Sequence, residues 1–136
     1  MIITRRDILK AIRTENLQGG SFIHGRLVEG EISKVMDSYC SVCAVGAVLR
    51  NKGLEGVEIY DTACRITSGT AIIRRDSFNE LKAIKKKKWL NALSIRFEHL
   101  VDKQSSRTNG VPTKKTKENL IRFVKRHFPK QIKVVA

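Results

Sequence analysis

The chain has 136 residues, which suits one folded domain, and its 41% hydrophobic and 29% charged residues exclude the composition of a disordered protein. No stretch approaches the roughly 20 apolar residues that span a bilayer, the N-terminus has no apolar run typical of a secretory signal, and three cysteines do not form a disulfide framework. We therefore expect a cytoplasmic protein with reduced thiols.

The formal net charge of +14 lies almost wholly in the second half of the chain. Residues 1–70 hold nine Lys and Arg against eight Asp and Glu, whereas residues 71–136 hold eighteen against five. Concentrated same-sign charge costs stability through self-repulsion, so it indicates a polyanionic partner. We expect a single domain over residues 1–136, with a near-neutral half and a strongly basic half.

The first predicted element is a helix over residues 5–15. Thr4 is placed as its N-cap, Asp7 as the returning acceptor of a capping box, and Ile3 with Ile8 as a hydrophobic staple. A short basic stripe on this helix comprises Arg6, Lys10 and Arg13.

The following segments alternate between strand-like and helical patterns. Residues 22–29 favour a strand or extended loop. Residues 39–52, YCSVCAVGAVLRNK, are apolar on almost every side and precede Gly53, which predicts a central, closely packed helix that ends there. Residues 57–73 contain Val, Ile, Tyr and Thr in rough alternation, which favours a β-hairpin, and a short helix over residues 60–65 is the alternative.

The basic half is predicted to be helical. Asp76 or Ser77 can cap a helix whose apolar stripe changes direction across the lysine run 85–88. This pattern predicts two helices, or one bent helix, with the lysines at the joint. Residues 103–112 are predicted to form a polar loop that leads into one last helix. Residues 131–135, after that helix, are predicted to form a terminal strand.

That last helix carries the clearest binding pattern. It begins near Thr113 or Thr116 and stops at Pro129. Side chains four to seven residues apart stand about 6–11 Å apart along a helix, a spacing comparable to that of successive phosphates on a strand. One side of the helix comprises Leu120, Ile121, Phe123, Val124 and Phe128, and the other comprises Lys115, Asn119, Arg122 and Arg126, flanked by Lys114 and Lys125.

The alternative is that the basic face of that helix is simply exposed to solvent and binds nothing. This alternative is less favoured because few acids lie near the cations of the basic half in the sequence. Loop residues Lys103 and Arg107 add to the charge. The predicted binding surface for nucleic acid or an acidic partner comprises Arg74, Arg75, Lys85, Lys86, Lys87, Lys88, Lys114, Lys115, Arg122, Lys125 and Arg126.

The aromatic residues favour phosphate contacts over base stacking. Phe78, Phe97, Phe123 and Phe128 lie at core spacing. Trp89, directly after the lysine run, is either a half-buried core residue or a stacking residue. No helix-turn-helix or RNA-recognition motif is legible, so sequence-specific readout is not predicted.

The cysteines and acids do not predict a metal site or a catalyst. Cys40 and Cys43 form a C-x-x-C pair inside an apolar helix, where free cysteine behaves as a small hydrophobe. Cys64 with His24, His99 or His127 could complete a zinc tetrahedron on paper, but no second paired motif is present. Glu98 and Asp102 fit an ordinary helix-surface pair, and no phosphate-binding glycine loop or hydrolase motif occurs. We therefore expect no catalytic residue, metal or cofactor.

Several segments resemble small uncharacterised proteins encoded by tailed bacteriophages and prophages. They are ILKAIRTENLQGG, YCSVCAVGAVLR, WLNALSIRFEH and LIRFVKRHFPKQIKV, the last with the pattern L-x-x-F-V-x-x-H-F-P. The resemblance implies a phage-encoded accessory protein that acts in a bacterial cytoplasm.

Together these patterns predict an α+β fold, mainly α. It would be a compact single domain with a central apolar helix, basic amphipathic C-terminal helices and a small β-hairpin or short sheet. The predicted function is non-enzymatic binding of DNA or RNA, mainly through phosphates. The alternative is an inhibitor or modulator that docks on an acidic surface of a host protein, such as a defence nuclease (anti-CRISPR or anti-restriction type) or RNA polymerase.

Overall fold

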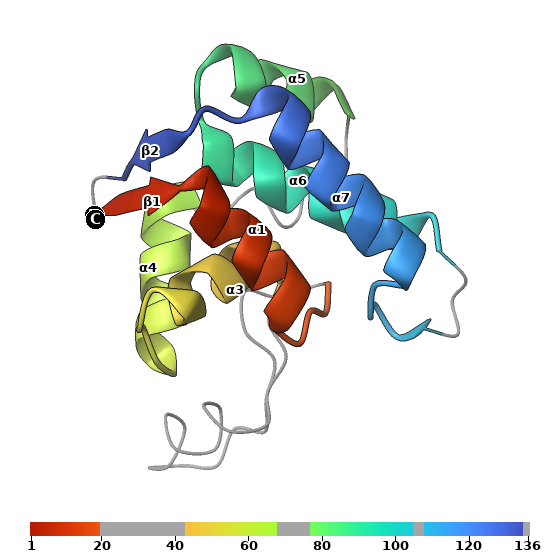
Figure 1. The fold of residues 1–136 in the computed structure, drawn as a ribbon, viewed down its shortest axis with the longest axis horizontal. Helices are drawn as coiled ribbons and strands as arrows, with labels where there is room; N and C mark the ends of the chain where they lie inside the picture. Colours follow the sequence, from red (N-terminus) through yellow and green to blue (C-terminus); the bar gives the residue numbers. More distant parts are fainter. Residues whose placement is uncertain (20–42, 68–76, 105–107, 135–136) are drawn as a thin grey trace.

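The computed structural model describes residues 1–19, 43–67, 77–104 and 108–134. Within these ranges, six helices and a two-stranded antiparallel sheet form a mainly α, α+β fold (Figure 1), which confirms the predicted fold class. The elements are β1 (Ile2–Thr4), α1 (Arg5–Thr14), α3 (Ala44–Asn51), α4 (Val57–Thr67), α5 (Ser77–Lys85), α6 (Trp89–Asp102), α7 (Lys114–His127) and β2 (Gln131–Lys133).

The two ends of the described chain pair with each other. β1 and β2 run antiparallel, with Ile3 opposite Ile132, and both of these side chains are buried. The Val134 backbone N–H extends the pairing by donating to the Met1 carbonyl at 2.9 Å. The predicted terminal strand is therefore confirmed at residues 131–133, and its partner β1 is an element that the sequence patterns did not predict.

The start of α1 forms as predicted. The Asp7 backbone N–H donates to Thr4 Oγ1 at 3.0 Å, and the Thr4 backbone N–H donates to Asp7 Oδ2 at 2.9 Å, which completes the capping box. Ile8, Ala11 and Ile12 form the buried face of the helix. This face packs on α3, and the helix also lies beside α7 (Figure 1).

α3 is the apolar helix expected at the centre, but Cys43 is its N-cap and not an interior residue. Residues 44–49 are all buried, and the helix ends at Asn51 with Lys52 as its C-cap, followed by Gly53, which has a φ of +96°. The Gly53 and Leu54 backbone N–H groups close the last turn as in a Schellman motif, as the C-terminal glycine predicted. Residues 39–42 of the predicted helix and the predicted strand at 22–29 lie outside the described residues.

α4 corrects the hairpin expected at 57–73, because residues 57–67 are helical; the alternative of a helix over 60–65 is confirmed, and residues 68–73 lie outside the described residues. Its β-branched residues Ile59, Thr62 and Thr67 are buried, and they recur at helical and not strand spacing. The Thr67 hydroxyl donates to the Ala63 carbonyl at 2.7 Å, so its polar group is satisfied inside the helix. The preference of β-branched residues for strands is weak and yields to burial.

α5 and α6 are two separate helices joined at the lysine run, as predicted. α6 packs against α3, α4, α5 and α7, so it shares the centre of the domain with α3. This arrangement leaves α1 and α7 side by side over the core, with one face of each helix exposed (Figure 1).

Candidate nucleic-acid interface

α7 is an amphipathic helix with a basic outer face. The Thr113 side chain caps its start by accepting from the Thr116 backbone N–H at 3.2 Å, and Thr116, Leu120, Phe123 and Val124 are buried. The cations on the opposite face are all exposed. We name these residues the α7 cations: Lys114, Lys115, Arg122, Lys125 and Arg126.

The lysine joint, Lys85, Lys86, Lys87 and Lys88, has an unusual backbone. The Lys87 N–H donates to the Ile84 carbonyl at 3.1 Å and the Lys88 N–H to the Ala83 carbonyl at 2.9 Å, the bonds of a Schellman motif. Lys87 occupies the left-handed position of this motif with a φ of +59°. α3 ends with the same hydrogen bonds but has Gly53 there. All four lysine side chains are exposed.

Phe128, just after α7, links the lysine joint to the α7 cations. The ring of Trp89, the first residue of α6, lies 5.5 Å from the Phe128 ring between centroids. Nearby, the Arg96 guanidinium lies over the Phe123 ring, 4.9 Å from its centroid. The lysine joint is thus brought to the C-terminal end of α7, beside the last turns that carry Arg122, Lys125 and Arg126, whereas Lys114 and Lys115 lie at the opposite end of the helix.

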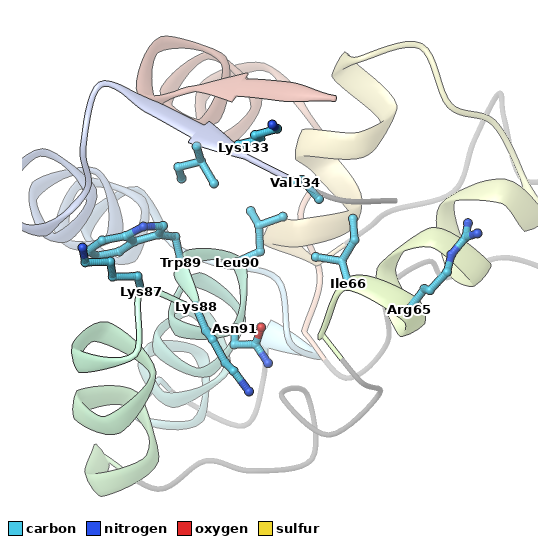
Figure 2. A pocket seen from close by; sticks show the side chains of 10 residues that line it. Arg65, Ile66, Lys87, Lys88, Trp89, Leu90, Asn91, Lys133 and Val134 are labelled. Carbon is cyan, nitrogen blue, oxygen red and sulfur yellow. The ribbon is translucent and has the colours of Figure 1, made fainter.

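A pocket of about 260 Å³ opens at this end of the molecule, between the start of α6, the end of α4 and β2 (Figure 2). Its lining includes Lys87, Lys88 and Trp89 of the joint. It also includes Arg65 from α4 and Lys133 from β2, cations that the sequence patterns did not assign to the site.

The α1 cations, Arg6, Lys10 and Arg13, also adjoin this region. The Arg5 guanidinium donates to the Phe128 carbonyl at 3.2 Å, which fixes α1 to the end of α7. A second, shallow pocket of about 350 Å³ is lined by Thr4, Arg5, Arg6, Leu9, Arg13 and Lys130.

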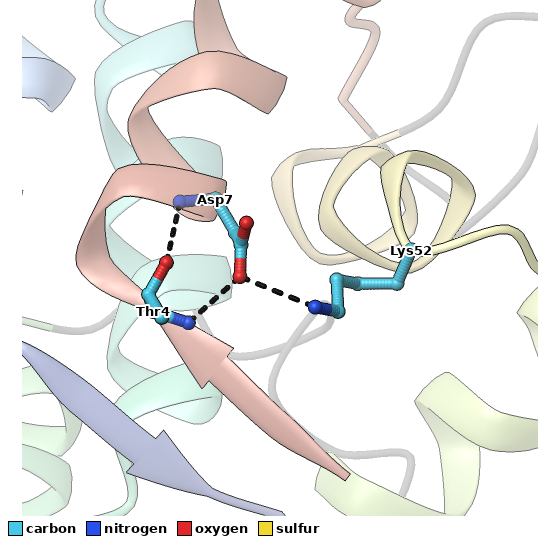
Figure 3. A network of polar contacts seen from close by, with 3 residues as sticks. All are labelled: Thr4, Asp7 and Lys52. Atoms are coloured by element: carbon cyan, nitrogen blue, oxygen red, sulfur yellow. Dashed lines mark hydrogen bonds and ion pairs between the residues drawn. The ribbon is translucent and has the colours of Figure 1, made fainter.

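Two described acids next to the α1 cations, Asp7 and Glu15, pair with cations at the end of α3. Asp7 Oδ2 lies 3.3 Å from Nζ of Lys52, the C-cap of α3 (Figure 3), and Glu15 Oε2 lies 3.4 Å from Nη1 of Arg50 on α3. Hydrogen bonds from Thr4, chiefly its backbone N–H, and the nearby Lys52 ammonium hold the pKa of Asp7 below its ordinary value. Within the described residues, the ion pairs of Asp7 and Glu15 therefore go to other cations, and Arg6, Lys10 and Arg13 form an exposed basic surface on α1.

Few carboxylates remain near these cations in the described part of the chain. Of the acids on α1, α5, α6 and α7, only Asp102 and Glu118 are exposed. Glu80 is 5% exposed, with Oε2 lying 3.5 Å from Arg96 Nη1. Glu98 is 1% exposed, so the expected helix-surface pair of Glu98 and Asp102 is wrong: Glu98 belongs to the interior.

Nine of the eleven predicted site residues are described, and all nine are exposed. They are the four lysines of the joint and the five α7 cations. Arg74 and Arg75 lie outside the described residues. The described aromatic residues Phe97, Phe123 and Phe128 are buried as expected, whereas Trp89 is only partly buried.

The described cysteines show no arrangement for metal binding. Cys43 is fully buried, its Sγ accepts from the Gly46 N–H at 3.5 Å, and burial raises its pKa to about 12. Among the described residues, no group of three or more His, Cys, Asp or Glu side chains could hold a metal ion. Cys40 and His24 lie outside these residues.

Comparison with protein-family models, with curated proteins and with solved structures finds no match to this chain. None of the helices in the described ranges is both long and apolar enough to cross a membrane.

Proposed function

We propose that the protein binds nucleic acid without catalysing a reaction, chiefly through phosphate contacts made by the basic interface. This name covers the α7 cations, the lysine joint and the α1 cations. The observation that carries the proposal is that Phe128, at the C-terminal end of α7, contacts Trp89 beside the joint and accepts a hydrogen bond from Arg5 at the start of α1, so that the three elements carrying these cations meet there.

The charge balance of this surface favours a polyanion. Twelve exposed cations from three parts of the chain belong to it, and the helices that carry them expose only two acids among the described residues. A face that was merely solvated would gain from interspersed acids, which relieve self-repulsion. Uncompensated cations instead supply the electrostatic attraction that dominates binding to a phosphate backbone.

The test is the salt dependence of binding to duplex DNA and to structured RNA, measured by fluorescence anisotropy. Log K against log salt should fall with a slope of about −4 to −7, corresponding to roughly five to eight phosphate contacts, and scrambling the base sequence should change the affinity little. No binding at about 50 mM salt, a permissive condition, would overturn the proposal.

An acidic protein surface would attract the same cations, so a second experiment separates the two kinds of partner. The tagged protein is used to capture partners from bacterial lysate with and without nuclease treatment. Nucleic-acid binding predicts that the captured material disappears after nuclease treatment. A captured protein that survives this treatment, together with absence of direct nucleic-acid binding, would favour the acidic protein instead.

A further inference from the structure

The pocket between α4, α6 and β2 has a cationic rim and an apolar floor. Arg65, Lys87, Lys88 and Lys133 are exposed and come from three separate parts of the chain, and the described residues that line the pocket include no acid. The apolar floor includes Leu90, Ile132 and Val134, each at most 7% exposed. A surface used only for phosphate contacts does not need such a floor.

Trp89 forms an aromatic wall at one end of the pocket, with Leu90 and Ile66 between it and Arg65 at the other end (Figure 2). Its ring is backed by Phe128, so it is held in place while part of it stays accessible. An immobilised aromatic ring beside cations is the arrangement on which a nucleic-acid base stacks.

The backbone at the rim supports the same ligand chemistry. Lys87 keeps a left-handed conformation that favours glycine, and strained residues of this kind cluster at binding sites. Lys88, the N-cap of α6, makes no side-chain capping bond. An anion at this opening would be well placed to accept from the backbone N–H groups of the first helical turn.

We propose that this pocket holds one unpaired nucleotide of a single strand, with its base against Trp89 and its phosphates on the cationic rim. The proposal rests on nucleic-acid binding by the basic interface and adds a preference that phosphate contacts alone do not give. Since the bases of an intact duplex are stacked and paired, they cannot enter the pocket, whereas a single strand or an unpaired end can. The volume of about 260 Å³ lies just below the roughly 300–1,000 Å³ of sites for drug-sized molecules, which suits one nucleotide.

Trp89 is the sole tryptophan of the chain, so intrinsic fluorescence reports directly on this pocket. The protein is titrated with oligo-dT, with an abasic strand of equal length and with a blunt duplex. Oligo-dT should quench Trp89 emission, and the other two should bind without comparable quenching. Binding of both oligo-dT and duplex with unchanged Trp89 emission would overturn the pocket proposal and leave the basic interface intact. Absence of all binding would overturn both proposals.

A matched pair of variants tests the rim. Lys86→Gln and Lys87→Gln remove the same charge from adjacent exposed residues, but only Lys87 lines the pocket. Both should weaken duplex binding equally, while Lys87→Gln alone should also reduce the quenching by oligo-dT. Equal effects of the two variants on quenching would contradict the proposal, as would an equal response of Trp89 to oligo-glutamate, which would assign the pocket to acidic peptides.

A third variant, Trp89→Leu, removes the stacking ring. It should weaken oligo-dT binding about tenfold or more, the loss typical of one stacked base, and weaken duplex binding much less. If this variant does not fold, the lysine pair still decides the question, since both lysines are exposed. A folded Trp89→Leu protein with unchanged oligo-dT affinity would overturn the proposal.

Discussion

Reversing the charge of three cations on α7 should abolish most nucleic-acid binding. The variant combines Lys115→Glu, Arg122→Glu and Arg126→Glu, all on the exposed face of the helix. If each cation contacts one phosphate, losing three contacts lowers the magnitude of the salt slope by about 2.7 and the affinity at 0.1 M salt by roughly two to three orders of magnitude. Repulsion from the introduced acids adds to this loss.

The fold should survive this change. Lys115 is the second residue of α7 and Arg126 is the second from its end. A glutamate stabilises a helix by about 0.3–1 kcal/mol at its start and destabilises it by a similar amount at its end, so the two effects largely cancel. The melting temperature, followed by circular dichroism, should therefore stay within a few degrees.

α1 offers a matched set, Arg6→Glu, Lys10→Glu and Arg13→Glu. Arg6 is again the second residue of its helix and Arg13 the second from the end. The charge count of residues 1–70 favours a smaller effect for this set. However, the ion pairs of Asp7 and Glu15 go to α3, so we expect a comparable loss of binding.

A control set, Glu55→Lys, Glu58→Lys and Asp61→Lys, adds exposed cations at the start of α4 and just before it. These substitutions should leave the salt slope nearly unchanged if the interface is local. Anisotropy titrations at several salt concentrations measure all three sets. Unchanged slopes for both the α7 and the α1 set would refute the assignment of the interface. A large increase in slope for the control set would show instead that net charge alone drives binding.

Three further predictions concern stability, measured by urea denaturation. Lys87→Gly should raise the free energy of unfolding by about 0.5–1 kcal/mol, because glycine adopts a φ of +59° without Cβ strain; a decrease would contradict the assigned backbone conformation. Cys43→Ala should cost about 1 kcal/mol more than Cys43→Ser, because a serine Oγ can accept the capping bond from Gly46; the opposite order would exclude the cap. Because hydrogen bonding holds the pKa of Asp7 below 3.8, Asp7 stabilises the fold above that pH and loses this effect as the pH falls through its folded-state pKa. The cost of Asp7→Asn should therefore shrink in acid, and a constant cost would contradict the capping role.

Local sequence signals were sufficient for several elements. The capping box at Thr4 and Asp7, the glycine after α3, the break at the lysine run and the limits of α7 each depend on residues within one or two helical turns. The amphipathic pattern of α7 likewise identified its exposed cations, because a helix with one apolar face can bury only that face.

Other features depended on contacts between distant segments. Pairing of β1 with β2 joins the two ends of the described chain, and nothing near Ile2 signals it. The composition of residues 57–67 favours a strand by local preference, and burial of one face against α3 and α6 makes them a helix.

The candidate site follows the same division. The sequence by itself determined which α7 residues are exposed and that the basic half contains little compensating acid. Only the tertiary structure added the α1 cations to the candidate interface, because Asp7 and Glu15 form ion pairs with Lys52 and Arg50 at the end of α3. It also assembled Arg65, Trp89 and Lys133 into one pocket. Charge and helical periodicity are properties of neighbouring residues, whereas a pocket or an ion pair depends on how helices pack, which is set by the buried surface of the whole domain.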